Sequence, residues 1–180
     1  PTRLLEAGFR FVKPTIEDFF EGTDHAAVDR LDLHRYMGTW YEIARFDHRF
    51  ERGLSEVTAT YTLMPDGTVR VENRGCKHKK PYDVCKTAEG RAKIPDPSQP
   101  GKLKVSFFLS FYSDYYVLEL DQDEYNYALI GSSSDKYLWI LSREPILPEE
   151  IKKKLLDAAT RRGYDVKKLI WVEQREKKIM

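Results

Sequence analysis

Between residues 38 and 143 the chain repeats short segments in which Val, Ile, Tyr, Phe and Thr alternate with polar residues. This two-residue period is typical of β-strands that have one buried face. Turn residues separate the segments, as in Pro65-Asp66-Gly67, where Pro fixes φ and Gly permits a positive φ. The eight predicted strands are residues 38–46, 56–64, 68–75, 85–94, 102–111, 115–121, 125–131 and 136–143.

Eight closely spaced strands with mostly short connections predict an all-β fold, either an eight-stranded up-and-down antiparallel barrel or a sandwich. A barrel of this size encloses an interior that side chains fill or that holds one small ligand. A chain of 180 residues is long enough for one such domain.

After residue 143 the apolar period becomes that of an α-helix. Pro148 suits the first helical position, Glu149 and Glu150 face the positive end of the helix, and Gly163 ends it. The apolar stripe is narrow, which predicts a helix packed on the outside of the barrel. The stripe consists of Ile151, Leu155, Ala158 and Ala159.

The chain divides into three parts around these elements. Residues 1–28 form an N-terminal extension of unassigned role, in which a short helix is expected at residues 14–22. Residues 29–174 form the barrel domain, with a short final strand expected within residues 167–174. Residues 175–180 are a tail.

The charges of the chain nearly balance, since 30 Lys and Arg stand against 29 Asp and Glu for a net charge of +1. A nucleic-acid partner requires a concentrated basic face, so none is expected. No apolar run reaches the roughly 18–20 residues of a membrane-spanning helix. Residues 1–13 also lack the apolar core of a signal peptide.

The reactive residue types form no catalytic or metal-binding motif. The four His residues stand at positions 25, 34, 48 and 78, without the spacing of metal ligands. The sequence contains no nucleophile elbow, phosphate-binding loop or dinucleotide-binding fingerprint. We therefore expect no enzyme, no metal and no cofactor.

Alternation predicts which side chains face the barrel interior, with the register of the eighth strand uncertain by one residue. The result is a mostly apolar wall with a few amides and phenols, which is the composition of a site for a lipid-like molecule. The predicted ligand-binding residues are Glu42, Ala44, Phe46, Ala59, Tyr61, Val71, Asn73, Ala88, Gly90, Val105, Phe107, Tyr116, Leu118, Asn126 and Trp139.

Two features of this wall leave alternatives open. The small residues of the fourth strand, Ala88, Gly90 and Ala92, are expected to leave volume empty, but the inward side chains could instead interdigitate and fill the barrel. Glu42 is interpreted as a buried structural or pocket polar group rather than a catalytic acid. Its alternative is an outward Glu that follows a bulge.

Three short regions resemble the signature regions of the lipocalin family: Gly38-Thr39-Trp40, Ser113-Asp114-Tyr115 and Arg143. The longer strings MGTWYEIARFDHRFERGL, VTATY, KVSFF, YLWILSR and IWV are similar to those of the bacterial outer-membrane lipocalins, the branch related to apolipoprotein D. The resemblance covers about residues 29–174. One mild departure is Ser113, where the family usually has Thr, because either hydroxyl can bond locally.

The resemblance implies a protein that binds and carries or sequesters a hydrophobic small molecule, a fatty acid or a lysophospholipid, in the cell envelope. It implies a periplasmic location at the outer membrane, reached through an N-terminal lipid anchor that this sequence does not show, since no Cys precedes Cys76. Monomer and homodimer both stay open. Two alternative functions remain: a lipocalin-type isomerase that uses a pocket cysteine, and an envelope structural protein.

Cys76 and Cys85 bracket the predicted hairpin between the third and fourth strands. If its turn centres near Lys80, the two cysteines face each other, and the oxidising periplasm that the resemblance implies would favour a disulfide. Two free thiols are the second reading, and a nucleophilic thiolate at Cys76 is the third.

Arg143 and Trp40 are expected to meet at the closed end of the barrel. Trp40 follows the start of the first strand and Arg143 ends the eighth, and these strands are neighbours in a closed eight-stranded barrel. A guanidinium over the indole face would form a cation–π contact, and its other donors would satisfy carbonyls at the strand ends.

Overall fold

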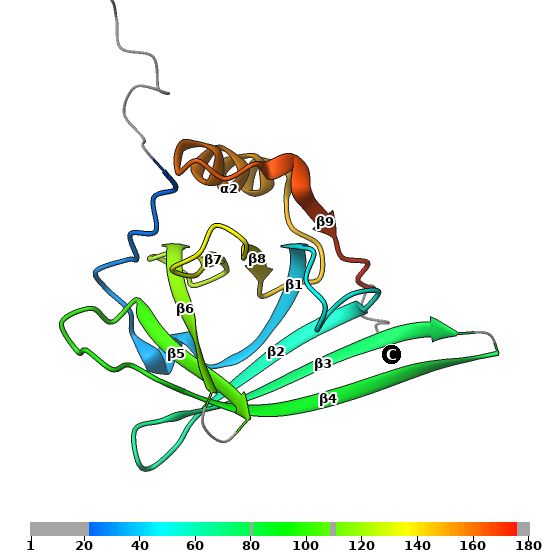
Figure 1. Ribbon diagram of the computed structural model, residues 1–180, viewed down its shortest axis with the longest axis horizontal. Helices are drawn as coiled ribbons and strands as arrows, with labels where there is room; N and C mark the ends of the chain where they lie inside the picture. The colour runs from blue at the N-terminus through cyan, green and yellow to red at the C-terminus, as the bar shows by residue number, and fades with distance from the viewer. Residues whose placement is uncertain (1–21, 80, 109–110, 176–180) are drawn as a thin grey trace, which may run out of the picture.

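The computed structural model describes residues 22–79, 81–108 and 111–175 (Figure 1). The helix expected at residues 14–22 lies outside these residues, except for Gly22. The helical elements are α1 (Leu33–Tyr36), α2 (Glu149–Arg161) and the 3₁₀ turn η2 (Val166–Lys168). The strands are β1 (Gly38–Phe46), β2 (Ser55–Leu63), β3 (Val69–Lys79), β4 (Tyr82–Lys93), β5 (Lys102–Phe108), β6 (Phe111–Leu120), β7 (Tyr127–Gly131), β8 (Trp139–Ser142) and β9 (Leu169–Trp171).

Strands β1 to β8 close into an antiparallel barrel. Consecutive strands pair from β2 to β8, and β1 closes the barrel by pairing with both β8 and β2. In the closing register, Gly38 of β1 lies opposite Tyr61 of β2, and Tyr41 lies opposite Ser142 of β8. The predicted barrel is confirmed, and the sandwich alternative is wrong.

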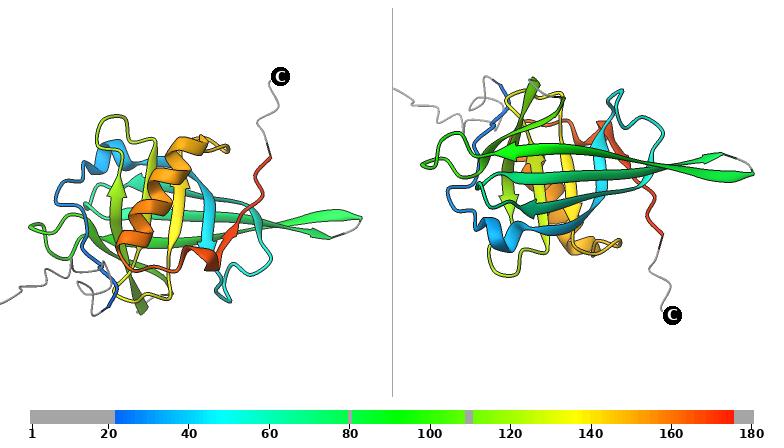
Figure 2. Two further views of the ribbon diagram at one scale, coloured as in Figure 1. Left: turned by 90° about the horizontal axis from the view of Figure 1, so that it is seen from above. Right: turned by 90° about the horizontal axis from the view of Figure 1, so that it is seen from below.

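Helix α2 lies against the outer face of the barrel (Figure 2). Its predicted apolar stripe is the face that becomes buried, since Leu155 and Ala159 pack against Leu118 and Ile140 of the sheet. Gly163 follows the helix with φ of +92°, the left-handed conformation in which a glycine is favoured. The final strand β9 then pairs with the second half of β1.

The two ends of the barrel differ in how they are closed. At the end where β1 begins, which we call the closed end, α1 and the chain before it cover the interior, with Leu33 and Val28 packed on the core. The opposite, open end carries the connection between β1 and β2, residues 47–54. No helix in the part of the chain described is long and apolar enough to cross a membrane.

Strands β3 and β4 run beyond the barrel as an arm, residues 76–85, of which residue 80 is not described (Figure 2). Strand β5 flanks β4 only at Arg91–Lys93, whereas β3 and β4 stay paired as far as Lys79 and Tyr82. The strands predicted as 68–75 and 85–94 are therefore longer than expected. Among the described residues of the arm, the side chains are exposed, apart from that of Cys76.

Candidate ligand-binding site

The barrel interior holds an apolar cluster to which most strands contribute. Three predicted ligand-binding residues, Tyr61, Val71 and Val105, are buried in it. Three more, Ala59, Phe107 and Trp139, are partly buried against it. The buried members of the cluster are Tyr36, Trp40, Tyr61, Val69, Val71, Ala92, Leu103, Val105, Val117, Tyr125, Ala128, Ile130 and Leu141.

In β1 the predicted inward orientation is wrong for Ala44 and Phe46. Both side chains lie on the outer face, in the cluster that includes α2. The cause is a β-bulge between Glu42 and Ala44, which inserts one residue and exchanges the two faces of the strand. Trp40 and Glu42 keep the predicted face, and Arg45 takes the inward position beyond the bulge, opposite Trp139.

In β6 the prediction is wrong by one residue. Tyr116 and Leu118 pack on the outer cluster beneath α2, and the inward residues are Tyr115 and Val117. This strand is apolar on both faces because α2 covers its outer side, so its alternation carries no signal for the register.

Two of the small residues of β4 do not leave the empty volume that was expected, and the two predicted asparagines differ in burial. Ala88 is exposed, because β5 does not flank that part of β4. At Gly90 the missing side chain is replaced by the ring of Phe107, which would lie 2.8 Å from a Cβ there. Asn126 is exposed in the turn before β7, so its predicted inward position is wrong. Asn73 is half-buried, and its Oδ1 is buried without a hydrogen-bond partner among the described residues.

Three tyrosine hydroxyls meet inside the closed end. The hydroxyl of Tyr115 lies 2.7 Å from that of Tyr36 and 3.0 Å from that of Tyr61. Burial raises the pKa of each of these phenols, so all three stay protonated. A cavity of about 10 Å³ beside them is also lined by Ala92 and Leu103, and it has room for about one water molecule.

Trp40 and Arg143 seal the floor below the tyrosines. Trp40 is fully buried and donates its Nε1 hydrogen to the carbonyl of Tyr36 at 2.9 Å. The guanidinium of Arg143 lies 3.9 Å from the centre of the indole ring, as expected. Arg143 also donates to the carbonyls of Arg35, Thr39 and Tyr125, at 2.7, 3.2 and 3.2 Å.

The open end contains a group of ionisable side chains, of which the sequence predicted Glu42 but not Arg45, His48 or Glu51. Arg45 is only 2% exposed, and its Nη1 donates to Oε1 of Glu42 at 2.8 Å. From the β1–β2 connection, Glu51 extends its Oε2 to Nε2 of His48 at 2.6 Å and to Nε1 of Trp139 at 3.1 Å. Arg45 holds the same connection through the carbonyls of Glu51 and Leu54. We call Glu42, Arg45, His48, Glu51 and Trp139 the mouth cluster.

The two carboxyl groups of the mouth cluster have opposite protonation tendencies. Burial, and then the negative charge of Glu51, raise the pKa of Glu42 well above its ordinary range. Burial acts in the same direction on Glu51, but the hydrogen bond and charge of His48 and the hydrogen bond from Trp139 outweigh it, so the pKa of Glu51 is lowered. Glu42 therefore tends to hold a proton while Glu51 carries the negative charge.

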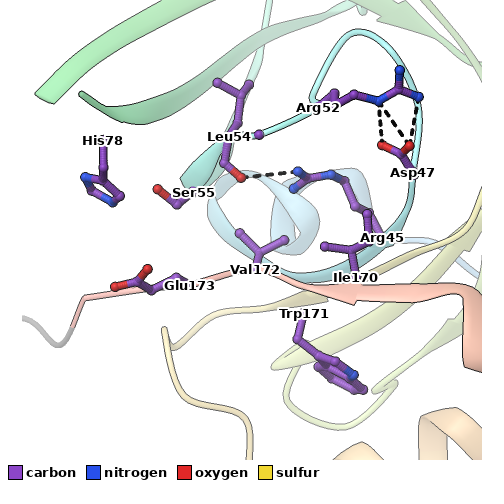
Figure 3. Close-up of a pocket in the computed structure, with 11 residues that line it drawn as sticks. Arg45, Asp47, Arg52, Leu54, Ser55, His78, Ile170, Trp171, Val172 and Glu173 are labelled. Carbon is purple, nitrogen blue, oxygen red and sulfur yellow. Dashed lines mark hydrogen bonds and ion pairs between the residues drawn. The ribbon is translucent and has the colours of Figure 1, made fainter. Parts of the chain in front are cut away.

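A hollow of about 500 Å³ lies outside the barrel, beneath the β1–β2 connection (Figure 3). Arg45, Arg52 and His78 contribute cationic or titratable groups to its wall, and Ile170 and Trp171 contribute apolar ones. The remaining lining residues are Asp47, Gly53, Leu54, Ser55, Val172 and Glu173.

The arm holds both cysteines, and two of its residues join Glu56 of β2 in a group of possible metal ligands. Cys76 and Cys85 form a disulfide between directly opposed positions of β3 and β4. His78, Glu56 and Asp83 place ligand atoms within 4.8 Å of one another. The guanidinium of Arg175 already bonds to Glu56 at 3.1 Å and to Asp83 at 2.8 Å. Glu56, His78 and Asp83 therefore form an ion-pair network in which Arg175 supplies the cation. The disulfide, in turn, removes the free thiol that the isomerase alternative requires.

The remaining signature residues, Asp114, Tyr115 and Gly38, each contact another part of the barrel. Asp114 forms an ion pair with Lys104 of β5 and accepts a hydrogen bond from Ser133. Tyr115 points into the tyrosine group of the closed end. Gly38 has φ of +93°, and a Cβ there would lie 3.3 Å from Nη1 of Arg143.

An eight-stranded antiparallel barrel with one outer helix, a floor sealed by an indole and an apolar interior is the architecture of barrels that bind small hydrophobic molecules. A model of the lipocalin-like domain matches residues 31–174. The chain belongs to the lipocalin family, and this membership supports binding of a hydrophobic small molecule in the barrel.

Similar proteins confirm the branch that the sequence indicated. The outer membrane lipoprotein Blc of Escherichia coli (strain K12) is 50% identical over 147 residues, which cover 82% of this chain and 81% of that protein. Apolipoprotein D of Mus musculus is 34% identical over 154 residues, covering 81% and 78%. Insecticyanin from the tobacco hornworm Manduca sexta shares the fold, with a TM-score of 0.67 at 24% identity over 85% of this chain and 86% of that chain.

Proposed function

We propose that the protein binds and carries, or sequesters, a fatty acid or a lysophospholipid inside the barrel. The observation that carries this proposal is the contrast along the barrel axis. An apolar cluster lines the interior, and the buried carboxyl groups and Arg45 gather at the open end. A compartment that is apolar along its length and polar at its mouth matches a molecule with one acyl chain and one polar head group.

The acyl chain would be held by burial of its apolar surface, at about 25 cal/mol per Å². The cavity at the closed end measures about 10 Å³, so an acyl chain that reaches this end must displace interior side chains. The partly buried Phe107 is an interior side chain that can give way, whereas Trp40 and Val71 are fixed in the packed floor. Carriage of this kind requires no chemical step, so we propose binding rather than catalysis.

The cell envelope is the location that the relatives support. Blc is an outer membrane lipoprotein by name and covers most of this chain. We propose that this protein works in the periplasm at the outer membrane. Fractionation of the natural host should recover it with outer-membrane vesicles, and recovery in the cytoplasmic fraction would contradict the assignment.

A chain-length series tests the function. A fluorescent fatty acid should bind at one saturable site, and unlabelled fatty acids should displace it. Their affinity should increase by up to about 0.8 kcal/mol for each added CH₂ until the barrel is full. An affinity that does not depend on chain length would contradict burial of the chain in the barrel.

A further inference from the structure

Glu51 occupies the mouth of the barrel in the way that a bound carboxylate would. Its side chain comes from the β1–β2 connection, and one oxygen, Oε2, accepts hydrogen bonds from Trp139 of β8 and from His48. Because a carboxylate only accepts, Nε2 of His48 carries the hydrogen in this contact. The side chain of Glu51 is 15% exposed, so a negative charge is already held here largely out of water.

The two donors are positioned without the help of Glu51. Trp139 belongs to a barrel strand, and its ring stacks on Tyr137 with centroids 5.8 Å apart. The His48 ring packs edge-on against Trp139 at 5.5 Å and against Tyr137 at 6.0 Å. If the Glu51 side chain left, both donors would therefore still point at the same place.

The mouth also contains two buried polar nitrogen atoms that form no hydrogen bond to any described residue. Within residues 22–79, 81–108 and 111–175, Nε of Arg45 and Nδ1 of His48 are buried without a hydrogen-bond partner. A buried donor without a partner costs free energy, most of all on a charged group. Arg45, at 2% exposure, is thus a buried cation with an unused donor, and its Nη2 contacts the backbone carbonyl of Glu51.

The hollow gives the second half of the β1–β2 connection, residues 51–54, room to move. The inner side of the connection presents His48 and Glu51 to the mouth, and its outer side, with Asp47, Arg52 and Leu54, lines the hollow of about 500 Å³ (Figure 3). Gly53 has φ of +73° and no atom within 4 Å of where a Cβ would be, and a glycine has the backbone freedom that a movement of the chain would use.

We propose that an anionic head group, a carboxylate or a phosphate monoester, binds at the mouth in place of the Glu51 carboxylate. It accepts the hydrogens of Trp139 Nε1 and His48 Nε2 beside the guanidinium of Arg45, while Glu51 turns toward the hollow and water. This exchange replaces one buried anion by another, so the cations and donors of the mouth need no new desolvation. The inference rests on the proposed function and adds the head-group class and its site.

Calorimetric titration with three amphiphiles of one chain length tests the proposal: a fatty acid, a lysophosphatidic acid and an uncharged monoacylglycerol. The measured quantity is the ratio of each anionic affinity to the uncharged one. In Glu51→Gln the competing charge is gone, and this ratio should rise about tenfold, or about 1.4 kcal/mol. A rise for the fatty acid alone assigns a carboxylate site, and a rise for the lysophosphatidic acid alone assigns a phosphate site.

Two variants separate a specific site from general charge repulsion. His48→Phe and Trp139→Phe keep an aromatic ring but remove the donor, and each should lower the ratio about three- to tenfold. Glu124→Gln removes the same charge from an exposed turn at the closed end and should leave the ratio unchanged. An unchanged ratio in Glu51→Gln and in both donor variants would overturn the inference alone. Failure of all three amphiphiles to bind the unmodified protein would overturn the proposed function and the inference with it.

Discussion

The closed and open ends of the same barrel are stabilised in different ways. At the closed end, the indole of Trp40, the tyrosine hydroxyls and carbonyl oxygens satisfy one another, and the guanidinium of Arg143 is bonded among them. At the open end, Arg45 and Glu42 are buried together with the partly covered Glu51 and His48.

The difference indicates which end of the barrel contributes most to stability and at which end the ligand is expected. Neutral groups that are fully hydrogen-bonded cost little to bury, whereas buried ionisable groups reduce stability unless each is paired. Perturbed carboxyl groups in a concave position are typical of functional sites. The closed end is therefore the stabilising half of the barrel, and the open end is the half available for recognition.

Loss of the floor should have the largest effect on stability. Trp40→Ala removes a fully buried indole and its hydrogen bond to Tyr36, and should lower the free energy of unfolding by about 3–5 kcal/mol. Denaturant unfolding followed by circular dichroism measures this loss. A loss below about 1 kcal/mol would mean that the floor does not support the barrel.

Two alanines of one strand give a matched pair of substitutions. Ala92 is 2% exposed and lines the cavity of about 10 Å³, so Ala92→Trp should destabilise the fold by about 3 kcal/mol through overpacking. Ala88, four residues earlier, is exposed, and Ala88→Trp should change stability by less than about 0.5 kcal/mol. Equal losses in thermal melts would contradict the placement of Ala92 in the barrel interior and of Ala88 on an exposed part of β4.

Arg143→Ala should have a smaller effect than loss of the indole, about 1–3 kcal/mol, because three carbonyls lose a donor and the ring loses its cation. The double variant with Trp40→Ala should lose less than the sum of the two, since residues in contact couple. Strict additivity in denaturant melts would contradict the 3.9 Å contact.

The buried Glu42 of the open end should make the stability of the fold depend on pH. The folded-state pKa of Glu42 is raised above its ordinary value of 4.5, so the stability that its proton contributes is present below pH 4.5 and is lost as pH rises toward the folded pKa. Glu42→Gln cannot ionise. As pH rises, the free energy of unfolding of the unmodified protein should fall relative to that of this variant. The fall should reach up to about 1.4 kcal/mol for each unit by which the pKa is raised. If the curves of unfolding free energy against pH run parallel for the unmodified protein and Glu42→Gln, the pKa of Glu42 is not raised in the folded state.

The sequence predicted the closed end better than the open end. Trp40 and Arg143 sit at strand termini that barrel closure must bring together, so chain order alone led to their contact. The barrel and the outer helix likewise followed from apolar periods and turn residues, which are local properties.

The open end could not be predicted because it depends on departures from regular strands. The bulge after Glu42 exchanges the faces of Ala44 and Arg45, and two consecutive apolar residues, Ile43 and Ala44, hide it from any alternation rule. Glu51 and His48 reach the mouth from a connection whose path no pattern specifies. One signal was present: Glu42, Arg45, His48 and Glu51 are each three positions apart.

Quenching of tryptophan fluorescence by a brominated fatty acid tests the central claim, that the ligand lies inside the barrel. Trp40 and Trp139 belong to the interior, and Trp171, 45% exposed, lines the outer hollow. If the chain enters the barrel, Trp171→Phe should keep the full saturable quenching, whereas Trp139→Phe at saturating ligand should lose most of it. Quenching that disappears in Trp171→Phe would place the ligand on the outer surface and contradict the account.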